Sequence, residues 1–190
     1  MLTIGTSTVR RHWFVDPTRA RNNRLLALQH FDADLRKLRE AVLHAHDSKK
    51  FELGIAALLY LHGFTPAIQV ETDAPDLLVS TPIGRLAVVE CTIRIADVAS
   101  KIGKLVDRRG ALSKAIAESG HAPQILAVLI CRLPRDQIAA HQADLQSQKV
   151  VLVSGDELIS AIANVRNPRD PDELYEQAQT TAGVAGTLPQ

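Results

Sequence analysis

Two acidic residues lie next to apolar stretches of the kind that fold into buried strands. Asp76 stands immediately before the apolar run LLVS, and Glu90 lies within RLAVVECTI, two positions before Thr92. Side chains alternate along a strand, so Glu90 and Thr92 share one face. If the two runs pair through the intervening Pro-Ile-Gly turn with Ser80 near Arg85, position 76 lies opposite about position 89. The spacing therefore predicts that the two carboxylates are neighbours at one end of a sheet.

Neighbouring carboxylates in such a place need a cation. They repel each other, and burying either of them unpaired costs free energy. Mg²⁺ or Mn²⁺ removes both penalties, because such an ion binds one or two carboxylates, keeps several waters and accepts phosphate oxygens. It can then activate water for phosphodiester hydrolysis. The other interpretation is that Asp76 caps a turn and Glu90 pairs with an arginine such as Arg85 or Arg94. The position of Glu90 in a central strand favours the metal site.

The elements around these acids predict an α/β fold. Apolar spacings of three and four predict one helix over residues 19–46, and a second, buried helix is expected from Ser48 to Gly63. A hairpin then leads into a strand–helix–strand crossover, which implies a mixed sheet flanked by helices. The expected strands are 65–70, 76–81, 85–93, 124–133 and 149–155, and the later helices are 96–120, 134–148 and 156–165.

We expect three regions in the chain: an N-terminal helical arm over residues 1–47, an α/β core over 48–166, and a flexible C-terminal tail over 167–190. The arm carries an apolar seam that must pack on the rest of the chain or on a copy of itself, and the second case predicts a homodimer through residues 28–42. The tail is rich in acids, prolines and small polar residues. The seam consists of Leu28, Phe31, Leu35, Leu38 and Val42.

The residues Pro75-Asp76, followed after a hairpin by Glu90-Cys91-Thr92, resemble the motif of the PD-(D/E)XK nuclease superfamily, which has the restriction-endonuclease-like fold. In that family a Pro-Asp is followed, after a hairpin-length gap, by an acid, any residue and a lysine. The resemblance covers residues 48–165, because a helix that carries Glu52 precedes the strands and a strand–helix–strand unit follows them.

This resemblance implies a Mg²⁺- or Mn²⁺-dependent endonuclease that acts on DNA. Asp76, Glu90 and the backbone carbonyl of Cys91 would bind the metal, and Glu52 would support the site. Thr92 departs from the family pattern, because it stands where the family has lysine and supplies no positive charge to the reaction. Either a cation has moved onto the following helix, or the site is degenerate and the protein only binds.

The helix expected over residues 96–120 offers the replacement cation. Lys101, Lys104 and Arg108 lie within roughly 60° of one another at the edge of its apolar side. A lysine at this boundary can lay its methylenes on apolar surface and present its amine to the acids. We expect Lys104 or Lys101 to take this role, and Lys101, Lys104, Arg108 and Arg109 to contact nucleic acid. The other interpretation is a solvated basic helix face.

Other residues with reactive side chains offer weaker patterns. Cys91 and Cys131 lie in apolar runs and are expected to be reduced core residues, and the seven histidines lack metal-ligand spacing. Five arginines precede position 25, opposed there only by Asp16, and they either grip a nucleic-acid backbone or form an ordinary solvated start. These arginines are Arg10, Arg11, Arg19, Arg21 and Arg24.

The bulk composition limits the class of protein. Hydrophobic residues make up 46% of the 190 residues, which is sufficient for one compact domain with appended structure. The net charge of +1 requires any nucleic-acid binding to rest on local clusters, and 4% aromatic residues argue against a base-stacking surface. No stretch approaches the ~18 apolar residues of a membrane span or forms a signal peptide, so we expect a soluble, cytoplasmic protein.

Two functional hypotheses follow from the sequence. The first is a metal-dependent endonuclease acting on DNA. The second is a catalytically inactive nuclease-fold module that binds nucleic acid or protein.

Overall fold

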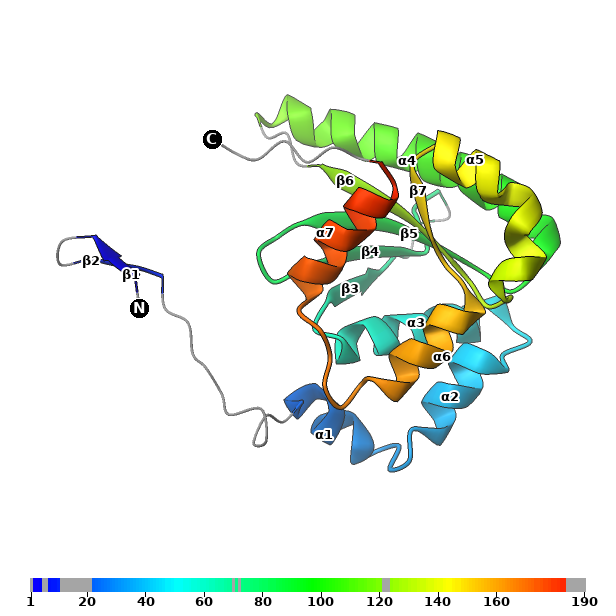
Figure 1. Ribbon diagram of the computed structural model, residues 1–190, viewed down its shortest axis with the longest axis horizontal. Helices are drawn as coiled ribbons and strands as arrows, with labels where there is room; N and C mark the ends of the chain where they lie inside the picture. The colour runs from blue at the N-terminus through cyan, green and yellow to red at the C-terminus, as the bar shows by residue number, and fades with distance from the viewer. Residues whose placement is uncertain are drawn as a thin grey trace.

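A five-stranded mixed sheet forms the centre of the fold in the computed structural model (Figure 1), which describes residues 2–4, 7–10, 22–69, 71, 73–120 and 124–183. The spatial order is β3-β4-β5-β6-β7; the first three strands pair antiparallel, and β5, β6 and β7 pair in parallel. The strands are β3 (Thr65–Ile68), β4 (Leu77–Ser80), β5 (Leu86–Thr92), β6 (Ile125–Cys131) and β7 (Val150–Val153). A separate antiparallel pair joins β1 (Leu2–Ile4) to β2 (Ser7–Arg10). The expected α/β architecture is confirmed.

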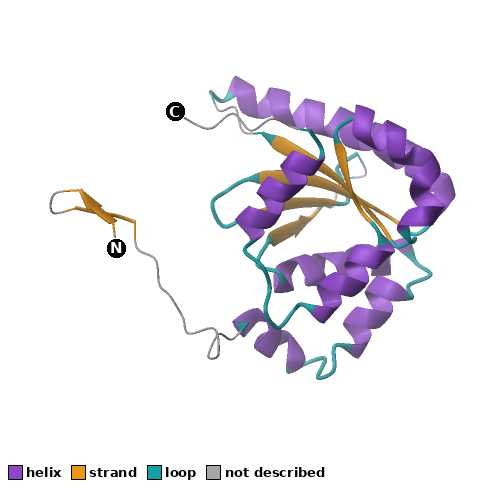
Figure 2. Cartoon of the chain, viewed as in Figure 1, coloured by secondary structure: helices purple, strands orange, loops and turns teal. Residues whose placement is uncertain are grey.

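Helices cover both faces of the sheet (Figure 2). On one face, α4 packs against even-numbered β5 residues such as Val88, together with α5; on the other, α3, α6 and α7 pack against odd-numbered residues such as Val89. The helices are α1 (Asn23–Gln29), α2 (Arg36–Leu43), α3 (Ser48–Leu61), α4 (Val98–Glu118), α5 (Gln142–Ser147), α6 (Gly155–Ala163) and α7 (Pro171–Thr181), with 3₁₀ turns at Ile95–Asp97 and Arg135–His141. No helix within the described ranges is long and apolar enough to span a membrane.

The β4–β5 hairpin differs by one residue from the expected register. Ser80 pairs with Leu86 rather than with Arg85, and Leu77 pairs with Val89. The turn therefore gains one residue, Arg85, whose carbonyl accepts the Thr81 N–H at 3.0 Å. Within the turn, Gly84 has a φ of 90° and donates its N–H to the Thr81 carbonyl at 2.9 Å. Glycine adopts this left-handed conformation without strain, so it accommodates the shift. Continuing the register brings position 76 opposite Glu90.

The expected N-terminal helix is two helices. Leu35 has a φ of 54°, which breaks the helix, and the Asp32 carboxylate accepts the N–H groups of Lys37 and Leu38 at 3.2 and 3.0 Å at the start of α2. Apolar periodicity continues across such a break, so the sequence pattern does not reveal it. The break leaves Phe31 77% exposed.

The apolar seam of this segment packs mainly on the chain itself. Leu35, Leu38 and Val42 are buried in the same core cluster as α3, so residues 22–47 belong to the core and do not form a separate arm. Phe31 is the most exposed member of the seam. A homodimer through residues 28–42 stays a prediction that would depend on this side chain.

The expected flexible tail contains α7, which packs on the sheet. Tyr175 is buried, and its hydroxyl lies 2.9 and 3.0 Å from the carbonyl oxygens of Leu86 and Gln124. Arg85 adds an ion pair with Glu176 at 2.6 Å. The tail expectation is therefore wrong for this helix, because its apolar face supplies contacts that the polar composition hides. Residues 184–190 lie outside the described part of the chain.

Replacing Tyr175 with phenylalanine is expected to lower the free energy of unfolding by about 1–2 kcal/mol. Phenylalanine lacks the hydroxyl that ties α7 to the Leu86 and Gln124 carbonyls, so this part-buried hydrogen bonding is lost. Urea denaturation measures the change. Tyr60→Phe is the matched control. Tyr60 is exposed, so the urea midpoint of this variant should equal that of wild type. Equal midpoints for both variants would show that the hydroxyl does not hold α7 in place.

His62 gives the fold an acid-sensitive contact. Its Nε2 lies 2.9 Å from the Ala161 carbonyl, joining the end of α3 to α6, and burial lowers the pKa of this imidazole below its usual 6.5. The unfolded state therefore binds the proton more tightly, so stability is present above the unfolded pKa and lost as the pH falls through the lowered one. We expect His62→Gln to reduce the loss of Tm between pH about 7.5 and about 5. His46→Gln, at an exposed site, should behave as wild type.

Candidate active site

Asp76 and Glu90 meet beside the β4–β5 hairpin, as the spacing predicted. The Asp76 Oδ2 accepts the backbone N–H of Cys91 at 2.7 Å, which fixes this carboxylate against the end of β5. Glu90 has no exposed surface and lies on the face of β5 that carries Val88 and packs against α4. The two acids therefore come from neighbouring strands and share the α4 side of the sheet.

Lys101 joins the two acids. Its Nζ donates to Asp76 Oδ2 at 2.7 Å and to Glu90 Oε2 at 2.5 Å. Val98, Ile102 and Leu105 are buried against the sheet and set the rotation of α4, so the neighbouring Lys101 lies at the boundary between core and solvent. One ammonium group thus sits where both carboxylates can reach it.

Arg108 supplies a second cation. Its Nη1 pairs with Glu90 Oε1, and its Nε donates to the Asp73 carbonyl at 2.9 Å. Lys101 and Arg108 are seven residues apart, about two helical turns, so they lie on one face of α4. Their two positive charges balance the two negative charges of Asp76 and Glu90. The sequence patterns did not predict Arg108 as a partner of Glu90. The seven-residue spacing between Lys101 and Arg108 is the sequence feature from which this pairing could have been inferred.

The arginines considered as partners for Glu90 are engaged elsewhere. Arg85 pairs with Glu176, and Arg94 pairs with Asp97 at 2.8 Å. Arg109 donates to backbone carbonyls of the turn before β7, at 3.1 and 3.0 Å, and its contact with nucleic acid stays a prediction. It holds α4 against that turn and shares no hydrogen bond with the acids.

The electrostatics of the cluster keep Lys101 charged. Burial raises the pKa of Glu90 and the Asp76 charge raises it further, while the hydrogen bond from Lys101 opposes the shift. Burial lowers the pKa of Lys101, but its hydrogen bonds and charge interactions with Asp76 and Glu90 outweigh this and raise it above the usual value of 10.5. The ammonium form is therefore favoured between the two carboxyl groups.

Thr92 does not reach the acids. Its hydroxyl donates to the Arg94 carbonyl at 3.1 Å and accepts the Arg94 N–H at 3.2 Å, so it stabilises the turn after β5. Of the two lysines considered as replacements, Lys101 contacts both carboxylates and Lys104 is exposed.

Glu52 stands near the cluster but has its own partner. Its carboxylate pairs with Lys49 at 2.9 Å on the first turns of α3. Burial raises the pKa of the Cys91 thiol well above its usual value, and the charges of Asp76 and Glu52 raise it further. Within the described residues, no three histidine, cysteine or acidic side chains form a metal-binding group. Any metal would rely on Asp76 and Glu90 with backbone and water ligands.

The N-terminal arginines can be followed only in part. Arg24 donates to the carbonyls of Tyr60 and Phe64 at 2.8 and 2.7 Å and stacks over the Tyr60 ring, so it has a structural role. The side chains of the others lie outside the part of the chain described, namely Arg10, Arg11, Arg19 and Arg21.

The fold is similar to that of the small subunit (R.BspD6I2) of the heterodimeric restriction endonuclease R.BspD6I. The TM-score is 0.57 over 80% of this chain and 89% of that chain, at 13% sequence identity. No family model and no curated protein matches the sequence. The structural similarity and the strand order together establish that this chain has a restriction-endonuclease-like α/β fold.

Proposed function

We propose that this domain is a metal-dependent phosphodiesterase that cleaves DNA. One observation carries the proposal: a single lysine amine on α4 bridges two carboxylates that come from adjacent strands of a restriction-endonuclease-like sheet. The pair needs a cation, and the amine marks a point within 2.7 Å of an oxygen of each acid.

The chemistry of this donor set fits Mg²⁺ or Mn²⁺. Asp76 and Glu90 supply two carboxylates, the number that Mg²⁺ commonly takes from a protein. The N–H and C=O of one strand residue point to the same edge, and the Cys91 N–H donates to Asp76, so the Cys91 carbonyl is the expected third ligand. When bound, the metal would activate water and stabilise the negative charge that develops on the phosphate.

The remaining residues have separate roles in this proposal. Lys101 would orient the attacking water and offset the developing charge in place of the motif lysine. Arg108 holds the Glu90 carboxylate in position and ties Asp73 to α4. Lys104, exposed on the same helix face, would contact the DNA backbone, and Glu52 would support the cluster through its charge.

The first experiment is incubation of the full chain with supercoiled plasmid and single-stranded DNA in Mg²⁺, Mn²⁺ or EDTA. Nicked or linear product that requires the metal is expected. Activity that persists in EDTA would contradict a metal-dependent mechanism, because the chelator removes the ion that is proposed to activate the water.

A second candidate function is a catalytically inactive module that binds DNA or protein. It is favoured by the neutrality of the cluster, since Lys101 and Arg108 already balance both acids. This candidate predicts no Mn²⁺ binding by calorimetry, together with DNA binding that weakens steeply as salt increases. Metal binding at one site per chain would favour the nuclease instead.

A further inference from the structure

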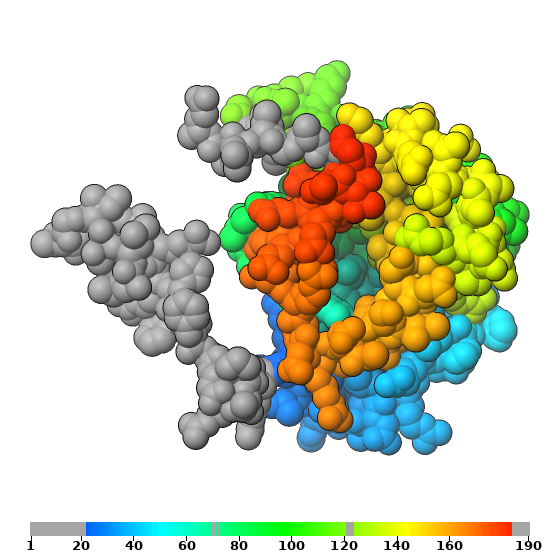
Figure 3. Space-filling model, in the orientation of Figure 1, coloured from blue at the N-terminus to red at the C-terminus, as the bar shows by residue number. Residues whose placement is uncertain are grey.

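An apolar cavity lies on the opposite face of the sheet from the acids. Its volume is about 430 Å³, and it is bounded by the sheet and by α3, α6 and α7 and open on one side. Figure 3 shows the hollow that opens between α7 and α6, with atoms of the sheet and α3 at its base. Helices α3 and α6 cover one end of the sheet face and α7 the other, so the middle of the face stays uncovered.

The walls of the cavity are mainly aliphatic, with Phe64 and Tyr175 among them. The strands contribute side chains from one face of the sheet. Two of these, Val128 on β6 and Val153 at the end of β7, are only half-buried. An unfilled apolar space of this size is costly, since void volume forfeits packing and an apolar wall does not hold water well. The volume lies within the ~300–1,000 Å³ range of small-molecule sites. The strand side chains are Val79, Ala87, Val89, Leu126, Val128, Ile130, Val151 and Val153.

Most polar side chains at the rim of the cavity already have partners, and Arg169 is the exception among the described residues. Glu157 is held by Ser154 and Arg135, Asn164 donates to the Ser160 carbonyl, and His62 contacts Ala161. Arg169 is exposed at the rim, and among the described residues it has no hydrogen bond or ion pair. A guanidinium group at the mouth of an aliphatic cavity favours a ligand with an apolar body and a carboxylate end.

We propose that this cavity binds a medium-chain aliphatic carboxylate, with its chain against Val128 and its carboxylate at Arg169. Most of the lining is aliphatic and fits an alkyl chain, and the rings of Phe64 and Tyr175 add further apolar surface. The site lies on the face of the sheet remote from Asp76 and Glu90, so it does not depend on the nuclease proposal and can be tested in proteins without metal.

Calorimetric titration of the full chain with sodium octanoate tests the proposal. We expect one molecule per chain with a Kd on the order of 0.1 mM, and a negative heat-capacity change from the buried apolar surface. Val128→Phe fills the cavity and should weaken binding at least about tenfold while the chain stays folded. If that variant does not fold, Ala178→Leu narrows the same space from α7. Arg169→Gln should weaken octanoate about tenfold and leave 1-octanol unchanged.

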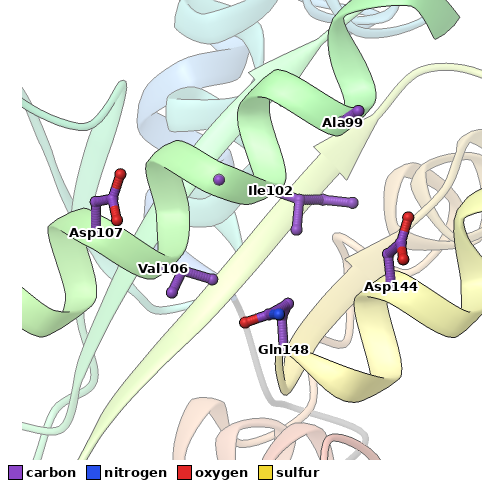
Figure 4. A pocket seen from close by; sticks show the side chains of 7 residues that line it. Ala99, Ile102, Val106, Asp107, Asp144 and Gln148 are labelled. Atoms are coloured by element: carbon purple, nitrogen blue, oxygen red, sulfur yellow. The ribbon is translucent and has the colours of Figure 1, made fainter.

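The control is Ala99→Phe, which introduces the same side chain into the groove between α4 and α5 on the other face of the sheet (Figure 4). Its octanoate affinity should equal that of wild type. The proposal is overturned if octanoate does not bind the folded chain, if the cavity-filling variants bind it as wild type does, or if Arg169→Gln has no effect. A wild-type dimer that Val128→Phe dissociates would assign the cavity to a second copy and would also overturn it.

Discussion

Asp76→Asn and Glu90→Gln proteins are expected to cleave DNA about a thousandfold more slowly than wild type in Mg²⁺. Each change removes one of the two carboxylates that would hold the metal, and the metal is expected to supply about 4 kcal/mol or more of transition-state stabilisation. The measurement is the initial rate of plasmid nicking at saturating Mg²⁺. Both variants keep the size of the side chain, and near-native circular dichroism confirms that they fold.

The matched control for these acids is Asp97→Asn. Asp97 pairs with Arg94 just before α4, so it is an acid near the same helix with no contact to the cluster. Its cleavage rate should stay within about twofold of wild type, since exposed ion pairs contribute little. Wild-type rates in Asp76→Asn and Glu90→Gln would contradict the proposed metal site. A loss of activity in all three variants would point to a general effect on folding.

Lys101→Met is expected to separate metal binding from catalysis. The Lys101 amine hydrogen-bonds to both carboxylates, where it competes with a metal ion. Removing it should therefore tighten Mn²⁺ binding about tenfold. The same change should lower the maximal cleavage rate about 100-fold, because the charge proposed to stabilise the reaction is lost. Calorimetry gives the first quantity and single-turnover cleavage the second. Weaker metal binding together with slower cleavage would mean that Lys101 only supports the fold.

Lys104→Met is the control for Lys101, three residues away on the same helix. Lys104 is exposed, and its loss should weaken DNA affinity at low salt while leaving the maximal rate unchanged. Thr92→Lys in the Lys101→Met protein adds a further test. Position 92 shares the face of β5 that carries Glu90, so a lysine there should restore part of the lost rate. No recovery in a folded double variant would show that the position of the amine on α4 matters.

The pairing of Asp76 with Glu90 could be predicted from the sequence, because strand alternation and a short hairpin are local features. The choice between Lys101 and Lys104 could not be predicted from the sequence. Three helical residues correspond to roughly 60° of rotation, less than the uncertainty of a sequence-based helix face. The choice depends on how Val98, Ile102 and Leu105 seat α4 on the sheet, which is a property of the packed core.

The expectations for the N-terminal helix and for α7 were wrong for different reasons. The break at Leu35 interrupts no apolar spacing, because a single left-handed residue leaves the pattern on either side intact. Helix α7 looked like a flexible tail because acids and prolines dominate its composition, although Asp170 caps it and Tyr175 anchors it. Helix α3 begins at Ser48, as expected, and the Asp47 carboxylate caps it by accepting the Lys50 N–H.

The most direct test of the metal site is a crystal structure of the chain soaked in Mn²⁺, with anomalous diffraction recorded to locate the ion. The account predicts an anomalous peak in contact with the Asp76 and Glu90 carboxylates, and a Lys101 amine that no longer bridges both acids. A crystal at saturating Mn²⁺ with no peak at these carboxylates, and with Lys101 still bound to both, would contradict it.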